Sequence, residues 1–378
     1  MKKVLIFSES LDGGGAEAAI TQVVRTLDKD FFDITVVSET DGELHTDEIR
    51  QLCRHTSFIR KNESGSFVKE AFNRVVLKSS VALPAGTVRR LYFKGKYDIE
   101  VAACEGYSTK IIAHSHSKNS VKVAYIHTDF INNPWSERVY KNGAAEEKEC
   151  YEKFDRIVCV SQTIKDAFVK KYGMADKVSV IYNIIDDEKI RRLSLETPDL
   201  SVSQRPLFAL TGNFLPVKGY DRLVRAAARL RENGYLFSVM IMGRDYQREP
   251  IEKLVEELKL GGVVTLLDFQ KNPFCLLKNA DCYVCSSLAE GYSTAVSEAI
   301  ILGLPVITTD CSGMKEIFGD EECGIICENS EDGLYTALKE VLDNPQKLTE
   351  FAKNSHRRAE DFSLKSRAQK VNEFYKSI

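Results

Sequence analysis

The sequence predicts an α/β protein with two domains, each built on a parallel β-sheet that helices cover on both faces. A chain of 378 residues is long enough for two cores of ordinary size. Short apolar runs alternate with amphipathic, helix-like segments, which is typical of parallel sheets. This alternation stops at a polar stretch near residue 190 and restarts after residue 205, which separates the two domains.

The first domain is expected to span residues 1–190. Ser161 and Gly173 stand where they would cap and end a helix. The expected strands are Val4–Phe7, Ile34–Val37, Ile99–Ala103, Val121–Ile126, Arg156–Val160 and Val178–Tyr182, and the expected helices are Ala16–Leu27 and Gln162–Tyr172.

Residues 191–205 are interpreted as a linker and residues 206–359 as the second domain. Residues 360–378 carry apolar side chains at helical spacing, so we expect a C-terminal helix that packs back on the first domain. The strands expected in the second domain are Leu207–Thr211, Ser238–Met242, Val263–Leu267, Asp281–Cys285 and Val306–Thr308, with a helix over Tyr220–Glu232.

The composition is that of a globular protein, with 43% hydrophobic and 28% charged residues and no apolar run long enough to span a bilayer. The ten cysteines are scattered through apolar runs, which indicates a reducing, cytoplasmic setting. Cys282 and Cys285 lie at an odd offset on an expected strand, so their thiols point to opposite faces and a shared metal ion is disfavoured.

One segment departs from the mixed charge of the chain. Residues 54–96 contain ten Lys or Arg but only two Glu, interleaved with apolar residues. Such a segment can rest on an anionic membrane surface, here the inner face of the membrane, or bind an anionic substrate. A solvated helix face with an ordinary core side explains it equally well. We expect no nucleic-acid partner.

The segment richest in possible ligand contacts is Glu290–Glu298. It follows an expected strand and opens a helix, and ligands of open α/β sheets gather at the carboxyl ends of strands. Ser293 or Thr294 would cap the helix, whose free N–H groups would face an anion. By spacing alone, two glutamates eight residues apart are more typical of a solvated surface.

Two further turns follow expected strands. Lys218 stands beside Gly219 ahead of a helix, where its charge can contact a phosphate, although an exposed lysine without a role is as common. Gly13, Gly14 and Gly15 lie between the first strand and the first helix, where backbone can approach a phosphate. A dinucleotide-binding turn would be tighter, so a dehydrogenase function is disfavoured.

Together these features resemble the retaining family-4 glycosyltransferases of the GT-B fold, in which two Rossmann-like domains face each other across a cleft. The resemblance runs nearly end to end and extends to members that build bacterial capsular and surface polysaccharides. The matching segments are Gly13–Glu17, Tyr125–Asp129, Tyr182–Asp186, Lys218–Gly219, Asn272–Phe274, Glu290–Glu298 with the residues up to Val306, and Cys311–Glu316.

The resemblance implies a role for each matching residue. Glu298 would bind the ribose, Glu290 the transferred sugar, and His127 that sugar near its reacting carbon. The diphosphate would be held by Lys218 and by the backbone at Gly14, Gly15, Gly291, Tyr292, Ser293 and Thr294. The co-substrate would be a nucleoside-diphosphate sugar, which we expect to be a UDP-sugar, and the acceptor a glycan or lipid-linked saccharide. No cofactor and no metal ion are expected.

One position departs from the family pattern. An arginine usually stands five residues before the lysine, and here that position is Asn213. This change removes a bidentate donor from the diphosphate. Arg244, which follows the next expected strand, is our hypothesis for its replacement.

The sequence also repeats itself. Glu105–Thr109 has the same five letters as Glu290–Thr294, and both copies follow a strand-like run that begins with aspartate. We place Glu105 and Asp129 on the acceptor side, although chance recurrence of a common turn is as good an explanation.

The resemblance implies transfer with retention of configuration, by attack on the same face of the sugar. Two other functions remain open. One is a nucleotide-sugar epimerase of the same fold, and the other is a non-catalytic sugar-nucleotide-binding module, which Asn213 leaves possible.

Overall fold

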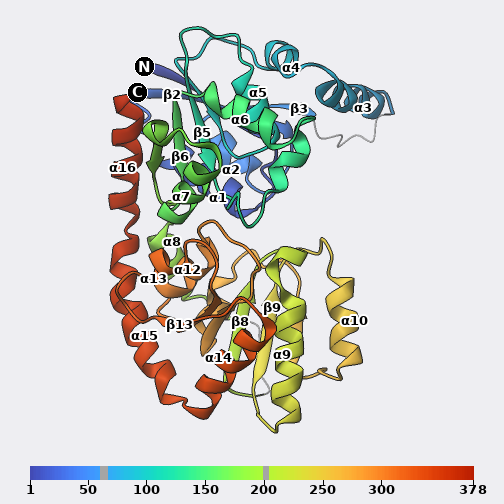
Figure 1. Cartoon of the computed structure of the whole chain (residues 1–378), viewed down its shortest axis with the longest axis vertical. Helices are drawn as coiled ribbons and strands as arrows, with labels where there is room; N and C mark the ends of the chain where they lie inside the picture. The colour runs from blue at the N-terminus through green and yellow to red at the C-terminus, as the bar shows by residue number, and fades with distance from the viewer. Residues whose placement is uncertain (60–66, 199–203) are drawn as a thin grey trace. The chain divides into compact units, whose positions relative to one another are not determined.

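A computed structural model of the chain describes residues 1–59, 67–198 and 204–378, and these form two compact units (Figure 1). The amino-terminal unit comprises Met1–Ile184 and Arg367–Ile378, and the carboxy-terminal unit comprises Ile185–Ser366. Parts of the basic segment (60–66) and of the expected linker (199–203) lie outside the described residues.

The amino-terminal unit is built on a seven-stranded parallel sheet in the order β3-β2-β1-β4-β5-β6-β7. The central strand β1 is buried from Val4 to Ser8, as expected for a strand with helices on both faces. The strands are β1 (Lys2–Ser8), β2 (Phe32–Thr40), β3 (Arg54–Ile59), β4 (Ile99–Ala102), β5 (Val121–Ile126), β6 (Arg156–Cys159) and β7 (Val178–Val180). The helices are α1 (Gly15–Thr26), α2 (Thr46–Leu52), α3 (Phe67–Ala82), α4 (Ala85–Tyr92), α5 (Tyr107–Ala113), α6 (Ala144–Glu152) and α7 (Gln162–Tyr172), with 3-10 turns η1 (Trp135–Val139) and η2 (Ala175–Lys177).

The carboxy-terminal unit is built on a six-stranded parallel sheet in the order β10-β9-β8-β11-β12-β13. Its strands are β8 (Leu207–Thr211), β9 (Ser238–Met242), β10 (Val264–Leu267), β11 (Cys282–Cys285), β12 (Val306–Thr309) and β13 (Gly324–Cys327). Its helices are α8 (Asp187–Leu193), α9 (Tyr220–Glu232), α10 (Glu249–Glu257), α11 (Phe274–Lys278), α12 (Thr294–Ile301), α13 (Met314–Phe318), α14 (Glu331–Asp343) and α15 (Gln346–Arg358), with 3-10 turns η3 (Pro216–Lys218) and η4 (Ala359–Phe362). One apolar cluster joins α9, α10 and α14 to alternate residues of the strands, while α11 and α12 pack with α8 and α15.

The expected elements are largely present, with ends that differ by one to three residues. Helix α7 has the predicted bounds, Ser161 caps it by accepting a hydrogen bond from Ile164 N at 3.2 Å, and Gly173 ends it at φ 80°. Strands β3 and β13 were not predicted. Strand β3 lies in the basic segment and consists mostly of polar residues that are exposed or partly exposed. Strand β13 has four residues and lies at the edge of its sheet.

The polar stretch expected to be a linker begins with a helix instead. Asp186 caps α8 by accepting a hydrogen bond from Lys189 N at 2.9 Å, and Ile190 is its buried residue. Helix α8 packs on α11 and α12, so the carboxy-terminal unit begins at Ile185, five residues before the end expected for the first domain. Five of its seven residues are charged, so the sequence of this helix lacks a clear apolar periodicity.

The predicted C-terminal helix is present as α16 (Leu364–Ser377), and it packs on the amino-terminal unit. Asn372 accepts a hydrogen bond from Asp28 N at 2.8 Å, and the hydroxyl of buried Tyr375 lies 3.3 Å from that of Tyr125. Both ends of the chain therefore lie together in this unit (Figure 1).

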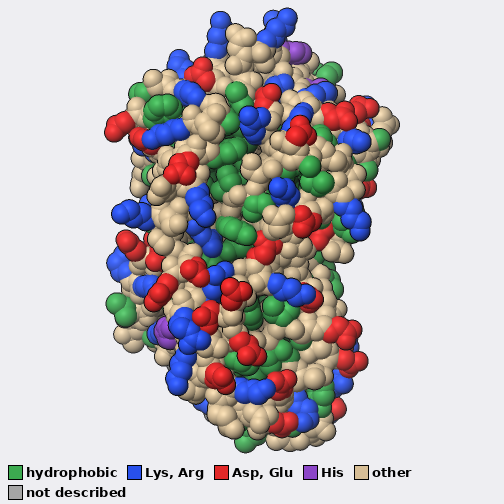
Figure 2. All heavy atoms as spheres, turned by 60° about the vertical axis from the view of Figure 1, so that its left-hand side comes forward, with side chains coloured by type: hydrophobic (Ala, Val, Ile, Leu, Met, Phe, Trp, Pro, Cys, Tyr) green, Lys and Arg blue, Asp and Glu red, His purple; other side chains and the backbone are tan. Residues whose placement is uncertain are grey.

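Charges of both signs are interspersed on the face of the molecule shown in Figure 2. Within the ranges that the structure describes, no helix is long and apolar enough to cross a membrane. All ten cysteines are free thiols.

Candidate functional site

Two predicted residues that lie far apart in the sequence meet in the carboxy-terminal unit. Lys218 ends η3 after strand β8, and Glu290 follows strand β11, the neighbour of β8 in the sheet. The Lys218 ammonium donates to Glu290 Oε1 at 2.7 Å. The two side chains are 27% and 14% exposed, so the pair is largely shielded but still open to a ligand.

The turn that carries Lys218 is tied to the turn that carries Glu290 by three contacts. Ser286 Oγ donates to Lys218 O at 2.8 Å, and Leu288 N donates to Val217 O at 2.7 Å. Gly219 has φ 60°, and a Cβ there would stand 2.3 Å from Ser286 O. A glycine is therefore required next to the lysine, both for its backbone conformation and for this close approach.

Polar side chains that the sequence did not single out hold Glu290 in place. Ser287 Oγ donates to Glu290 Oε1 at 2.6 Å, and Thr309 Oγ1 donates to Ser287 O at 2.6 Å. Arg222 donates to Ser286 O at 2.7 Å and to Asn329 O at 3.0 Å. Serines and threonines at strand ends are common in any α/β sheet, so nothing in their local sequence marked them as supports.

The charge of Lys218 is maintained by its surroundings. Burial by itself lowers the pKa of a lysine, but the Glu290 carboxylate beside it outweighs that effect and raises the pKa of Lys218. The site therefore presents a protonated ammonium paired with the Glu290 carboxylate.

Helix α12 begins at Thr294, four residues after Glu290. Ser293 caps it, as predicted, by accepting a hydrogen bond from Val296 N at 3.3 Å. Tyr292 is buried, and a Cβ on Gly313 would stand 2.5 Å from Gly291 O, so a second loop packs against this turn. The first N–H groups of a helix have no acceptor within it, and the macrodipole makes this end attractive to an anion.

Glu298 lies one turn into α12, and α8 packs against this helix. Burial raises the pKa of Glu298 to about 7, and the nearby Lys189 offsets only part of this effect. A carboxylate in this environment gains from hydroxyl donors such as those of a ribose, because they replace the hydration it has lost.

The backbones of Asn213 and Arg244 are neighbours. Phe214 N donates to Arg244 O at 3.0 Å, and a Cβ on Gly243 would stand 1.9 Å from Gly212 O. The Arg244 guanidinium lies 4.8 Å from the centre of the Phe269 ring. The arginine thus belongs to the same loop cluster as the position that lacks one.

In the amino-terminal unit, Gly14 and Gly15 open α1, and Gly14 is its N-cap residue. A Cβ on Gly14 would lie 2.2 Å from the Glu17 carboxylate, so the glycine leaves room for that side chain. The twelve-residue helix directs its first N–H groups toward this loop.

His127 follows β5 in the same unit. Its Nε2 lies 3.0 Å from Ala103 O, and burial lowers the pKa of His127 to about 4. The ring is therefore neutral near pH 7 and donates from Nε2 to this carbonyl, which leaves Nδ1 as an acceptor for a hydroxyl.

Glu105 and Asp129 are buried, at 1% and 3% exposure. The Glu105 carboxylate accepts hydrogen bonds from His127 N at 2.5 Å and Thr128 N at 2.6 Å. Asp129 accepts from Ile131 N at 2.8 Å and from the Asn132 side chain at 2.8 Å. Both carboxylates are thus engaged in holding the loop that follows β5.

A pocket of about 720 Å³ in the amino-terminal unit contains Glu39 and a second carboxylate, Glu9, that the sequence did not single out. Glu9 follows β1 and accepts a hydrogen bond from Ser108 N at 2.9 Å. Burial raises the pKa of Glu9 to about 7, and burial also raises the pKa of Glu39. Tyr107, from the repeated pentapeptide, lines the same pocket. Glu9 stands between the first strand and the glycine loop, outside the matching segments, so no motif marked it.

Comparison with known families defines the class of this protein as a glycosyltransferase. The sequence model described as Glycosyltransferase Family 4 matches residues 13–189, and the model described as Glycosyl transferases group 1 matches residues 196–358. The chain therefore belongs to the glycosyltransferases that combine a family 4 domain with a group 1 domain.

Similar proteins cover nearly the whole chain. A Campylobacter jejuni N-acetylgalactosamine-N,N'-diacetylbacillosaminyl-diphospho-undecaprenol 4-alpha-N-acetylgalactosaminyltransferase is 24% identical over 96% of each chain. An Escherichia coli UDP-Gal:alpha-D-GlcNAc-diphosphoundecaprenol alpha-1,3-galactosyltransferase is 24% identical over 96% of this chain and 93% of its own. The crystal structure of Anabaena HepE in complex with UDP and glucose has a TM-score of 0.78 and 18% identity, with all of both chains covered, which supports the predicted GT-B fold.

Proposed function

We propose that this glycosyltransferase moves a sugar from a UDP-sugar to a lipid-linked saccharide with retention of configuration. The names of the two relatives describe acceptors on diphospho-undecaprenol, and one of them names UDP-Gal as donor. The observation that carries the proposal is the Lys218–Glu290 ion pair, which places a cation close to the amino-terminal end of α12.

The reaction requires stabilisation of the leaving diphosphate. When the bond between the anomeric carbon and the diphosphate oxygen breaks, negative charge develops on that oxygen. The Lys218 ammonium then leaves the Glu290 carboxylate and pairs with this oxygen. The N–H groups at Gly291–Thr294 face the same negative charge. Glu290 is then free to accept hydrogen bonds from the sugar. The acceptor oxygen bonds to the anomeric carbon on the same face, and its proton passes to the leaving diphosphate.

The remaining donor contacts follow the predicted roles. Glu298 accepts from the ribose, neutral His127 accepts from a sugar hydroxyl through Nδ1, and the backbone at Gly14 and Gly15 contacts the diphosphate. Arg244 supplies the guanidinium that Asn213 does not. No cofactor takes part.

For the acceptor we propose the pocket that contains Glu9, Glu39 and Tyr107. Its carboxylates and phenol are suited to hydroxyl groups of a saccharide. Glu105 and Asp129, predicted on the acceptor side, support this region by holding the neighbouring loop.

We also propose contact with an anionic membrane at its cytoplasmic face through residues 54–96. Helix α3 leaves apolar side chains exposed among basic ones, a composition typical of helices that lie in the membrane interface. The exposed apolar residues are Phe67, Val68, Phe72, Val75, Leu77 and Val81.

The test is an assay with a panel of UDP-sugars and an undecaprenyl diphosphate-linked N-acetylhexosamine, with the product anomer determined by NMR. We expect one α-linked product from an α-linked donor. Inversion at the anomeric carbon would reject retention, epimerised donor without an acceptor would indicate an epimerase, and binding without turnover would indicate a non-catalytic module. EDTA is expected to leave the rate unchanged, because Lys218 and backbone N–H groups would stabilise the leaving diphosphate in place of a metal ion.

A further inference from the structure

A second large pocket lies at the opposite edge of the amino-terminal sheet from the glycine loop. Its volume is about 1160 Å³, and it is formed by the start of β1, the end of α4 and the loops that precede β4 and β5. Parallel strands begin at one edge of a sheet and end at the other, and Gly14 and Glu9 follow the end of β1. This pocket is therefore separate from the proposed donor and acceptor contacts.

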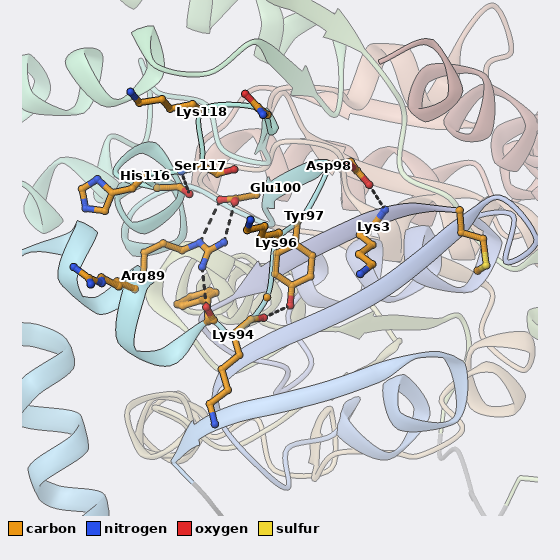
Figure 3. Close-up of a pocket in the computed structure, with 16 residues that line it drawn as sticks. Lys3, Arg89, Lys94, Lys96, Tyr97, Asp98, Glu100, His116, Ser117 and Lys118 are labelled. Atoms are coloured by element: carbon orange, nitrogen blue, oxygen red, sulfur yellow. Dashed lines mark hydrogen bonds and ion pairs between the residues drawn. The ribbon is translucent and has the colours of Figure 1, made fainter.

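The pocket is rich in positive charge (Figure 3). Among the described residues, none of its five peripheral cations forms an ion pair, and the one nearby exposed carboxylate, Asp98, accepts a hydrogen bond from Lys3 N at 2.7 Å. The five are Lys3, Arg90, Lys94, Lys96 and Lys118. They come from four separate segments of the chain, so their proximity is a product of the fold.

The floor of the pocket is a buried ion pair. Arg89 donates to Glu100 at 2.8 and 3.3 Å (Figure 3) and to Phe93 O at 3.1 Å. Ser120 Oγ lies 3.2 Å from the same carboxylate. Arg89 is 7% exposed and Glu100 is fully buried. The floor is neutral and rigid, so the peripheral cations are not balanced from below.

The rim is also ordered by a local contact. Tyr97 Oη donates to Lys94 O at 2.7 Å, which holds the turn containing Lys94, Gly95 and Lys96 (Figure 3). Several uncompensated cations around one hollow repel each other, and a multiply charged anion relieves that repulsion. Phosphate groups offer two charges and several acceptor oxygens, which suit lysine and arginine donors.

We propose that this pocket binds a phosphate group, carried either by an anionic lipid headgroup or by a soluble phosphorylated molecule. The proposal is independent of the transfer reaction, because it concerns the other edge of the sheet. It gives the basic residues of the pocket a specific ligand in place of a general attraction to anions.

The test compares two double variants of the full chain with equal loss of charge. Lys94→Ala with Lys96→Ala alters the pocket, whereas Lys148→Ala with Lys170→Ala removes exposed lysines of α6 and α7 in the same unit. Saturating UDP keeps phosphate probes out of the donor site. One arm titrates inorganic phosphate by calorimetry, and the other measures sedimentation with phosphatidylcholine vesicles that contain phosphatidylglycerol or lack it.

We expect the pocket variant to bind at least tenfold more weakly and the control to stay within twofold, since each lysine near an anionic surface contributes about fivefold. Loss restricted to the phosphatidylglycerol vesicles identifies a lipid headgroup as the source, and loss of phosphate binding identifies a soluble ligand. Equal weakening of both variants, or no binding of either probe by the natural chain, overturns the proposal. Lys118→Ala, from another segment, is expected to weaken binding about fivefold and serves if the double variant does not fold.

Discussion

The same pentapeptide occurs at equivalent positions in the sheets of the two units, but its glutamate makes different contacts in each unit. In each sheet the strand before the repeat, β4 or β11, lies beside the first strand of its unit. Each is preceded by an aspartate that accepts a hydrogen bond from that neighbouring strand, Asp98 from Lys3 N and Asp281 from Leu207 N, both at 2.7 Å. The recurrence noticed in the sequence therefore marks equivalent positions in the two sheets.

What differs is the distance between strand and glutamate. Glu105 comes three residues after β4 ends at Ala102, whereas Glu290 comes five residues after β11 ends at Cys285. The short turn places Glu105 against the backbone N–H groups that follow β5, and the longer turn lets Glu290 reach Lys218. One carboxylate is engaged with backbone, and the other is paired with a side chain that a ligand can displace.

The largest expected effect comes from removing Lys218, the lysine partner of Glu290 that has no counterpart at Glu105. Lys218→Ala is expected to lower kcat/KM about 10²- to 10³-fold, the usual loss when one group that stabilises a developing anion is removed. Lys253→Ala, in an exposed ion pair with Glu249 at 2.6 Å, is the control and should change the rate less than twofold. A Lys218→Ala enzyme with normal kcat/KM would remove this residue from the mechanism.

The second prediction compares the two glutamates directly. Glu290→Gln is expected to lower kcat/KM about 10- to 100-fold with little change in thermal stability, because hydrogen bonds to a charged group contribute about 1.5–3 kcal/mol. Glu105→Gln is expected to destabilise the fold by about 1–3 kcal/mol, because two buried backbone N–H groups exchange a charged acceptor for a neutral one. Denaturant unfolding and initial rates on both variants check this.

The opposite pattern at Glu105 would change our interpretation. If Glu105→Gln leaves stability intact and abolishes acceptor saturation, the residue contacts the acceptor as predicted from the sequence.

A smaller effect is expected at the position where the diphosphate contacts depart from the family pattern. Arg244→Ala should raise the donor KM about tenfold if its guanidinium replaces the missing arginine, the loss of one charged hydrogen bond. Asn213→Arg in the same background is expected to restore part of the affinity. Unchanged KM in Arg244→Ala would reject the hypothesis.

The smallest effect concerns pH. Because the pKa of Glu298 is about 7 in the free protein, its carboxyl is mostly protonated at pH 6 and mostly ionised at pH 8. An ionised carboxylate accepts ribose hydroxyls better, so UDP affinity should rise with pH by up to about tenfold over this range. Glu298→Gln should lose that rise, which calorimetry at the two pH values measures. A parallel rise in the variant would assign the pH dependence to another group.

The sequence was most informative where local patterns decide structure. The bounds of α7 and α9 followed from caps and apolar periodicity, and the central strands followed from short apolar runs. Three elements were not predicted. Strand β3 and helix α8 contain few apolar residues, and the short edge strand β13 is flanked by charged residues.

The site shows the same limit. Lys218, Glu290 and Glu298 were singled out through the resemblance, but their partners depend on contacts across 72 residues of chain, as in the Lys218–Glu290 pair. The role of Ser287 and the burial of Glu105 are tertiary properties that no local spacing encodes.

Helix α16 has a consequence for biosynthesis. The residues that finish the amino-terminal unit, from Arg367 onward, are translated after the whole carboxy-terminal unit. Until then the surfaces around Tyr125 and Asp28 that receive Tyr375 and Asn372 stay uncovered. The amino-terminal unit, whose synthesis begins first, therefore reaches its final stability only after the carboxy-terminal unit has been made.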